Sequence, residues 1–219
     1  MGTGAPPILR IPLTLLAAAD LTLLGMRLWP WQEVANLPGN GTTGLDPVLT
    51  LLAYIALLFW VGGNKNLEVR KALSAGTMIG LPAGILLVAQ VLLAAQPVTQ
   101  PIFLQIGLLG VAAILWGIAG MRGAQIAGNS GIGMLSGMWS AMVSCLMACA
   151  AVLEELSLAG PAPVTQDPWK QYEGLAIGNP AVQALVHSLN TATAFLLIGP
   201  LVGVVLGLLF ALSAQGRKG

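Results

Sequence analysis

Ionisable side chains are rare in this sequence, and the one that stands out chemically is Asp20, in the middle of the apolar run 11–29. If that run crosses a membrane, the carboxyl lies near the bilayer centre, where an ionisable group costs roughly 3 kcal/mol or more and marks a candidate functional site. Three interpretations stay open. Asp20 is a proton or cation site, or a structural carboxyl that burial and hydrogen bonding hold in the neutral form, or the first span lies shallowly in the membrane.

His187 is the only histidine of the chain and lies near one end of another apolar segment. A lone histidine in a helix bundle can bind the metal of a haem or a pigment axially. A b-type haem normally takes two such ligands, so a pigment with one axial ligand is the version that stays open. The plainer interpretation is a hydrogen-bonded imidazole near the membrane surface, and the sequence does not identify a cofactor.

Small polar side chains in the apolar segments complete a predicted intramembrane polar site. Its members are Asp20, Ser140, Ser144, His187 and Asn190. Further residues that would line it are Thr22, Ser136 and Gln183. Because charged side chains are nearly absent from these segments, a cavity lined by this set would take a neutral or apolar solute. No spacing typical of a metal site is present in the sequence.

One motif resembles a catalytic pair. Gly128-Asn129-Ser130-Gly131, followed by His187, resembles the serine–histidine pairing of rhomboid intramembrane proteases, which need both side chains within hydrogen-bond reach. The spans proposed below would separate Ser130 from His187 by most of the ~30 Å apolar core. The motif is therefore interpreted as a turn and helix start with Ser130 as the cap, and no catalytic residue is predicted.

A second motif, Asn179-Pro180-Ala181-Val182, resembles one of the two NPA boxes of aquaporins. No second box with a following arginine is found in the sequence. An N-cap at Asn179 and a proline at the first helical position explain the motif as an ordinary helix start.

The composition requires an apolar solvent. Of the 219 residues, 56% are hydrophobic and 8% charged, with a mean hydropathy of +0.84, whereas soluble domains carry roughly 25% charged residues. Long unbroken apolar runs such as 102–121 and 194–212 indicate membrane-spanning helices rather than the alternating strands of a barrel. A net charge of +1 offers no basic patch for nucleic acid.

We therefore predict an all-α, polytopic transmembrane helix bundle in which residues 1–219 form a single integral membrane domain. Spans need about 20 apolar residues. The predicted spans are about 11–29, 46–62, 73–95, 102–121, 131–156 and 180–212. Because the last span is long and contains Gly199-Pro200, counts of five spans or seven helices also stay open.

The basic residues predict the orientation of these spans, because lysine and arginine collect in short cytoplasmic loops. Seven of them fall on one side: Arg10, Lys65, Arg70, Lys71, Arg122, Arg217 and Lys218. Both termini are therefore expected in the cytoplasm, without a secretory signal peptide, and the protein in the cell (inner, cytoplasmic) membrane. The outer segment 159–179 is then a lid, a docking surface or a spacer.

Small residues four positions apart predict tight helix packing, because they let two backbones approach closely. Three such stripes contain Gly76, Gly80 and Gly84, then Gly133 and Gly137, then Gly199, Gly203 and Gly207. They can pack within the chain or mediate self-association and contact with other membrane subunits. Cys145 and Cys149 continue the middle stripe and are expected to be reduced.

These observations favour a non-enzymatic role. The first interpretation is an accessory or scaffolding subunit of a larger membrane complex, whose partners are the lipid bilayer and other membrane subunits. The alternative is a small transporter, or the substrate-binding membrane subunit of one, for a neutral or apolar solute. An intramembrane enzyme ranks last, because no nucleophile, base and acid can be brought together from this sequence.

Overall fold

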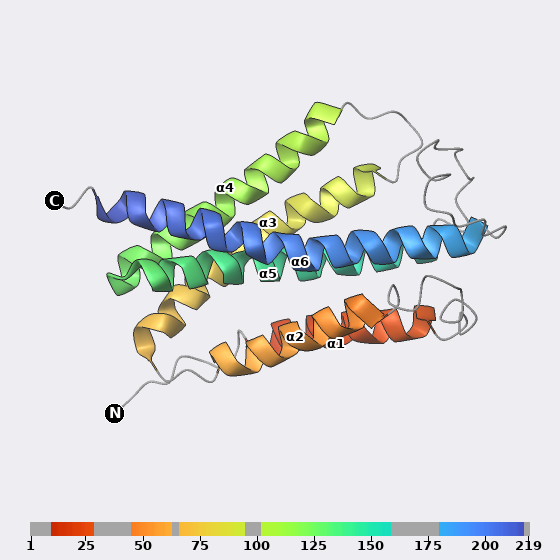
Figure 1. The fold of residues 1–219 in the computed structure, drawn as a ribbon, viewed down its shortest axis with the longest axis horizontal. Helices are drawn as coiled ribbons and strands as arrows, with labels where there is room; N and C mark the ends of the chain where they lie inside the picture. The colour runs from red at the N-terminus through yellow and green to blue at the C-terminus, as the bar shows by residue number, and fades with distance from the viewer. Residues whose placement is uncertain (1–9, 29–44, 63–65, 95–101, 159–179, 217–219) are drawn as a thin grey trace.

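The computed structural model describes residues 10–28, 45–62, 66–94, 102–158 and 180–216 (Figure 1). Within these ranges the fold is all-α, with no strand. The helices are α1 (Arg10–Leu28), α2 (Leu45–Gly62), α3 (Leu67–Ala94), α4 (Ile102–Ala127), α5 (Ser130–Leu158) and α6 (Pro180–Gln215). The prediction of six helices in a membrane-type bundle is confirmed.

The helix boundaries agree with the predicted spans except at two charged ends. α3 begins at residue 67 rather than 73, and α4 ends at residue 127 rather than 121. The helices continue there through Arg70, Lys71 and Arg122, which hydropathy alone assigns to loops. The Asn66 Oδ1 atom accepts a 2.9 Å hydrogen bond from the Glu68 N–H group and caps the longer α3.

Four helices are long and apolar enough to cross a membrane: α3, α4, α5 and α6. In α1 and α2 the apolar stretches that the structure describes are shorter, Thr14–Met26 and Val48–Leu57. The membrane character of the bundle is therefore established by length and composition for four helices. Crossing by α1 and α2, and the cytoplasmic position of the termini, stay predictions.

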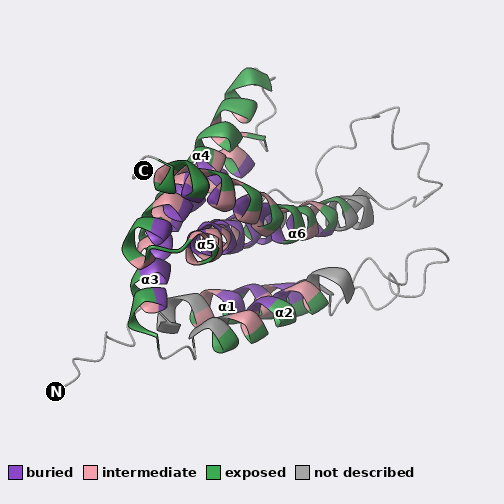
Figure 2. Cartoon of the chain, turned by 60° about the vertical axis from the view of Figure 1, so that its left-hand side comes forward, coloured by how far each residue is buried: buried purple, intermediate pink, exposed green. Residues whose placement is uncertain are grey.

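Helix α5 is the centre of the bundle. Of the residues in the apolar stretch of α5, 72% are buried inside the protein. The corresponding share in α3, α4 and α6 is only 22% to 33%. It packs against α1, α3, α4 and α6, and buried residues surround most of its circumference (Figure 2). The α1–α2 pair lies along one side of the bundle, where α1 contacts α5 and α2 contacts α6 (Figure 1).

The glycine stripe of α3 packs on a serine row of α5. A Cβ atom on Gly76 or Gly80 would lie 2.8 Å or 2.7 Å from a carbonyl oxygen of α5, so no larger residue fits. The facing pairs are Gly76 with Ser136, Gly80 with Ser140 and Gly84 with Ser144. Both partners advance by four residues in the same direction, so α3 and α5 are parallel.

A neighbouring face of α5 packs on the glycine stripe of α6 with the reverse register. The facing pairs are Gly133 with Ala211, Gly137 with Gly207, Ala141 with Gly203 and Cys145 with Gly199. One partner advances as the other recedes, so α5 and α6 are antiparallel. Both cysteines are buried and free, as expected. The glycine faces predicted to pack helices are thus covered within this chain.

Helix α4 joins this arrangement at only one of its ends. A Cβ atom on Gly120 would collide with the backbone of Gly207, and one on Gly133 would lie 2.6 Å from the Gly120 carbonyl oxygen. Toward the other end of α4, a Cβ atom on Gly107 or Gly110 would have no atom of the described residues within 4 Å. α4 therefore diverges from α6 toward Ile102, as Figure 1 shows.

The turn between α4 and α5 explains the Gly128–Gly131 motif. Gly128 ends α4 with a φ of 66°, the left-handed conformation that favours glycine at a helix end. The Asn129 Oδ1 atom accepts a 2.7 Å hydrogen bond from the Gly131 N–H group. Asn129, not Ser130, is therefore the N-cap of α5, because Ser130 is already its first helical residue.

Pro200 lies inside α6, and the helix is continuous through it. A proline has no N–H group, so the carbonyl oxygen four residues earlier loses its helical donor. That oxygen belongs to Leu196, and the buried Tyr54 hydroxyl of α2 donates a 2.6 Å hydrogen bond to it. The proline thus creates the acceptor that ties α2 to α6.

The junction where Gly120 of α4, Gly133 of α5 and Gly207 of α6 meet gives a stability prediction. We expect Gly120→Ala to destabilise the protein by about 1–3 kcal/mol, the usual cost of overpacking, because the new methyl group meets the backbone of Gly207. The matched control is Gly110→Ala on the same helix, where the methyl group meets open space. Thermal unfolding in mild detergent measures both, and equal melting temperatures would contradict this packing.

The Tyr54–Leu196 hydrogen bond gives a second prediction. Tyr54→Phe leaves a buried carbonyl oxygen without a donor, at a cost of about 1–3 kcal/mol. In a Pro200→Ala background the backbone N–H group restored at position 200 supplies that donor, so the same change should cost much less. A double-mutant cycle of unfolding free energies measures this coupling. Additive effects of the two substitutions would show that the Tyr54 hydroxyl does not compensate for the donor that Pro200 removes from the Leu196 carbonyl oxygen.

Candidate functional site

Asp20 is fully buried, on the face of α1 that packs against the bundle. Neither of its carboxyl oxygens has a hydrogen-bond partner among the described residues. A carboxyl that is buried without a hydrogen-bond partner in the described chain is costly to hold in its charged form.

The two predicted serines, Ser140 and Ser144 of α5, take part in a chain of hydrogen bonds that begins at Trp116 of α4. The Trp116 indole N–H group donates a 2.9 Å hydrogen bond to the Ser144 Oγ atom. Ser144 in turn donates a 2.5 Å hydrogen bond to the Ser140 carbonyl oxygen. The Ser140 Oγ atom is buried without a partner in the described ranges. Ser136 donates a 2.9 Å hydrogen bond to the Ala72 carbonyl oxygen of α3.

His187 and Asn190 lie on the exposed surface of α6 near its first turns. One turn further along, the Thr191 hydroxyl donates a 2.9 Å hydrogen bond to the His187 carbonyl oxygen. Within the described residues, no hydrogen bond joins this end of α6 to Asp20 or to the serine pair. The structure thus groups Ser140 with Ser144, and the assembly of all five residues into one polar site stays a prediction.

The other predicted residues are placed as follows. Thr22 is exposed and donates a 2.7 Å hydrogen bond to the Ala18 carbonyl oxygen of its own helix. The side chain of Gln183 and the segment 159–179 lie outside the described residues. Among the described residues, no group of three or more metal-binding side chains comes together. Axial ligation by His187 stays a prediction.

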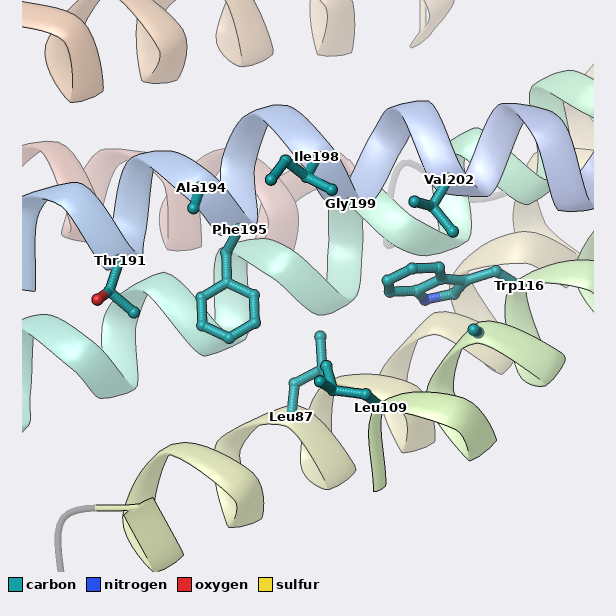
Figure 3. A pocket seen from close by; sticks show the side chains of 10 residues that line it. Leu87, Leu109, Trp116, Thr191, Ala194, Phe195, Ile198, Gly199 and Val202 are labelled. Atoms are coloured by element: carbon teal, nitrogen blue, oxygen red, sulfur yellow. The ribbon is translucent and has the colours of Figure 1, made fainter. Parts of the chain in front are cut away.

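The structure adds a cavity that the sequence did not predict. It has a volume of about 430 Å³ and lies between α3, α4 and α6. Its lining residues are Leu87, Leu109, Ala113, Trp116, Thr191, Ala194, Phe195, Ile198, Gly199 and Val202. Thr191 lies at one end of the cavity, and Trp116 and Val202 lie at the other (Figure 3). This volume lies within the ~300–1,000 Å³ range of small-molecule sites.

The divergence of α4 opens this cavity, and two aromatic rings shape it. The Trp116 indole is fixed by its hydrogen bond to Ser144, and Phe195 projects from α6 toward Leu87 of α3 (Figure 3). Leu109 and Ala113 occupy the part of α4 that has moved away from α6. Since these side chains are apolar or have their polar atoms bonded elsewhere, the walls favour an apolar molecule.

Comparison with protein-family models, with curated proteins and with solved structures finds no significant match.

The buried carboxyl gives a stability prediction with a matched control. We expect Asp20→Leu to be neutral or to stabilise the protein, because it removes a buried polar group that has no partner in the described chain. Thr77→Val, also buried, should destabilise it by about 1–3 kcal/mol, because the Trp139 indole N–H group loses its acceptor. Chemical denaturation in detergent measures both. Unfolding of Asp20→Leu would show that the carboxyl is held by a partner.

Proposed function

We propose that the chain is a multi-pass protein of the cytoplasmic membrane that binds a neutral, apolar solute in the cavity between α3, α4 and α6. It would act as a small transporter or as the substrate-binding membrane subunit of one, with both termini in the cytoplasm. The cavity carries this proposal, because it is large enough for a small molecule and is built from membrane-crossing helices.

The lining of the cavity sets the class of solute. None of its ten residues is ionisable. The Trp116 N–H group and the Thr191 hydroxyl hydrogen are both used in bonds to the protein. A charged solute would lose its hydration without replacement, at high cost, whereas an apolar one exchanges lipid contacts for protein contacts.

A second candidate is an accessory or scaffolding subunit, and a feature of α4 favours it. Gly107 and Gly110 are exposed, with no atom near their built Cβ positions. They form a small-residue face that, unlike the other glycine faces, is not covered by described residues. A transmembrane helix of another subunit could approach α4 closely at this point.

The solute-binding proposal predicts a molecule that co-purifies with the chain. Native mass spectrometry of the full chain in mild detergent should find an added apolar mass. Ala194→Trp fills the cavity from α6 and should lower the bound fraction about tenfold, a loss of ~1.4 kcal/mol of binding free energy. Leu197→Trp is the matched control, because Leu197 is exposed on the same helix but does not line the cavity.

The result decides between the two candidates. Loss of the added mass in Ala194→Trp, with retention in Leu197→Trp, supports solute binding. A wild-type chain that carries no added mass, or equal occupancy in the two variants, would contradict it. Recovery of other protein chains in a fixed ratio, released by Gly107→Leu, would support the accessory subunit instead.

A further inference from the structure

The cavity extends along α6 by the depth of one membrane leaflet. Its lining residues on this helix begin at Thr191 and end at Val202. At ~1.5 Å per residue, this stretch is about 16 Å long, close to half of the ~30 Å hydrocarbon core. The unbroken apolar run of α6, 194–212, begins three residues after Thr191 and has its middle next to Val202. The cavity therefore runs from one edge of the apolar core to about its middle.

The two ends of the cavity differ in polarity. At the shallow end, the Thr191 Oγ1 atom keeps lone pairs that can accept a hydrogen bond from water at the membrane surface. His187 is four residues before Thr191, so it lies on the same face of the helix and is exposed. At the deep end, Trp116, Gly199 and Val202 offer only carbon to the cavity. A molecule that matches both ends has a polar head and an apolar tail.

We propose that the solute is a membrane phospholipid, with one acyl chain in the cavity and its head beside Thr191 and His187. This proposal rests on the proposed function and names its ligand class. The cavity of about 430 Å³ holds roughly fourteen groups the size of a water molecule, at ~30 Å³ each. A methylene group is of similar size, so the cavity accommodates one acyl chain rather than two.

The orientation of the lipid follows from the same geometry. The chain terminus reaches Trp116 and Val202, and the ester region stays near Thr191. The His187 imidazole can donate a hydrogen bond to a phosphate or ester oxygen of the head. Leu109 of α4 and Ile198 of α6 line the cavity and are themselves exposed, so a lipid can enter from the bilayer between these two helices.

Photolabelling of the full chain in phosphatidylcholine vesicles tests this proposal. Two phosphatidylcholine probes carry a diazirine, one near the chain terminus and one near the ester. A third probe, adamantyl diazirine, is apolar and has no head. We expect the chain-terminus probe to label the peptides that contain Trp116 and Val202, and the near-ester probe to label the peptide around Thr191. Ala194→Trp should abolish both, and Leu197→Trp should preserve them.

Replacement of His187 tests the contact with the head. His187→Leu should reduce labelling by both phosphatidylcholine probes roughly fivefold, about the value of one hydrogen bond, and leave adamantyl labelling unchanged. His187→Gln keeps a donor and should restore most of the signal. Equal labelling of the wild-type chain and both His187 variants would show that His187 does not contact the head, and would overturn the proposed orientation.

The probes separate this inference from the proposed function. If adamantyl diazirine labels the cavity and both phosphatidylcholine probes do not, an apolar solute binds there and the phospholipid proposal is wrong. If the two phosphatidylcholine probes instead label the peptides at both ends of the cavity equally, the contacts are those of bulk lipid. The phospholipid proposal is then also wrong. If no probe labels the cavity, both proposals fail.

Discussion

The close approach of backbones to α5 is the constraint on which this structure depends. In a membrane, burial of apolar side chains gives helices little reason to associate, because lipid is equally apolar. Contact at van der Waals distance must supply the attraction, and glycines make it possible. α5 offers serine oxygens to the glycines of α3 and small residues to the glycines of α6. One helix thus fixes the parallel and the antiparallel direction of its two neighbours.

The same constraint explains why a cavity forms where it does. α4 packs closely against α5 and α6 at the junction of Gly120, Gly133 and Gly207, whereas Gly107 and Gly110 meet no described atom. The cavity lies between these two ends of α4, from Leu109 to Trp116. The side chains of Trp116 and Phe195 fill only part of the space that the divergence of α4 from α6 leaves (Figure 1).

The sequence predicted the features that carry a strong local signal. Apolar length located the six helices, and small residues at every fourth position located the packing faces. It could not pair those faces, because a glycine stripe does not specify its partner. It also missed the Tyr54–Leu196 bond, since a proline shows which carbonyl is freed but not which donor reaches it. The cavity was invisible because Leu87, Leu109 and Ile198 have the same residue types as lipid-facing positions.

Several polar side chains of the described helices serve helix packing. The Tyr54, Ser136 and Trp139 side chains each join two helices through a hydrogen bond, and Ser144 fixes the Trp116 indole at the deep end of the cavity. These hydrogen bonds hold the described helices together. Asp20 is bonded to none of the described residues, but it lies on α1, which does not line the cavity. The cavity that we propose as a lipid site therefore offers shape and the polarity of its shallow end for recognition.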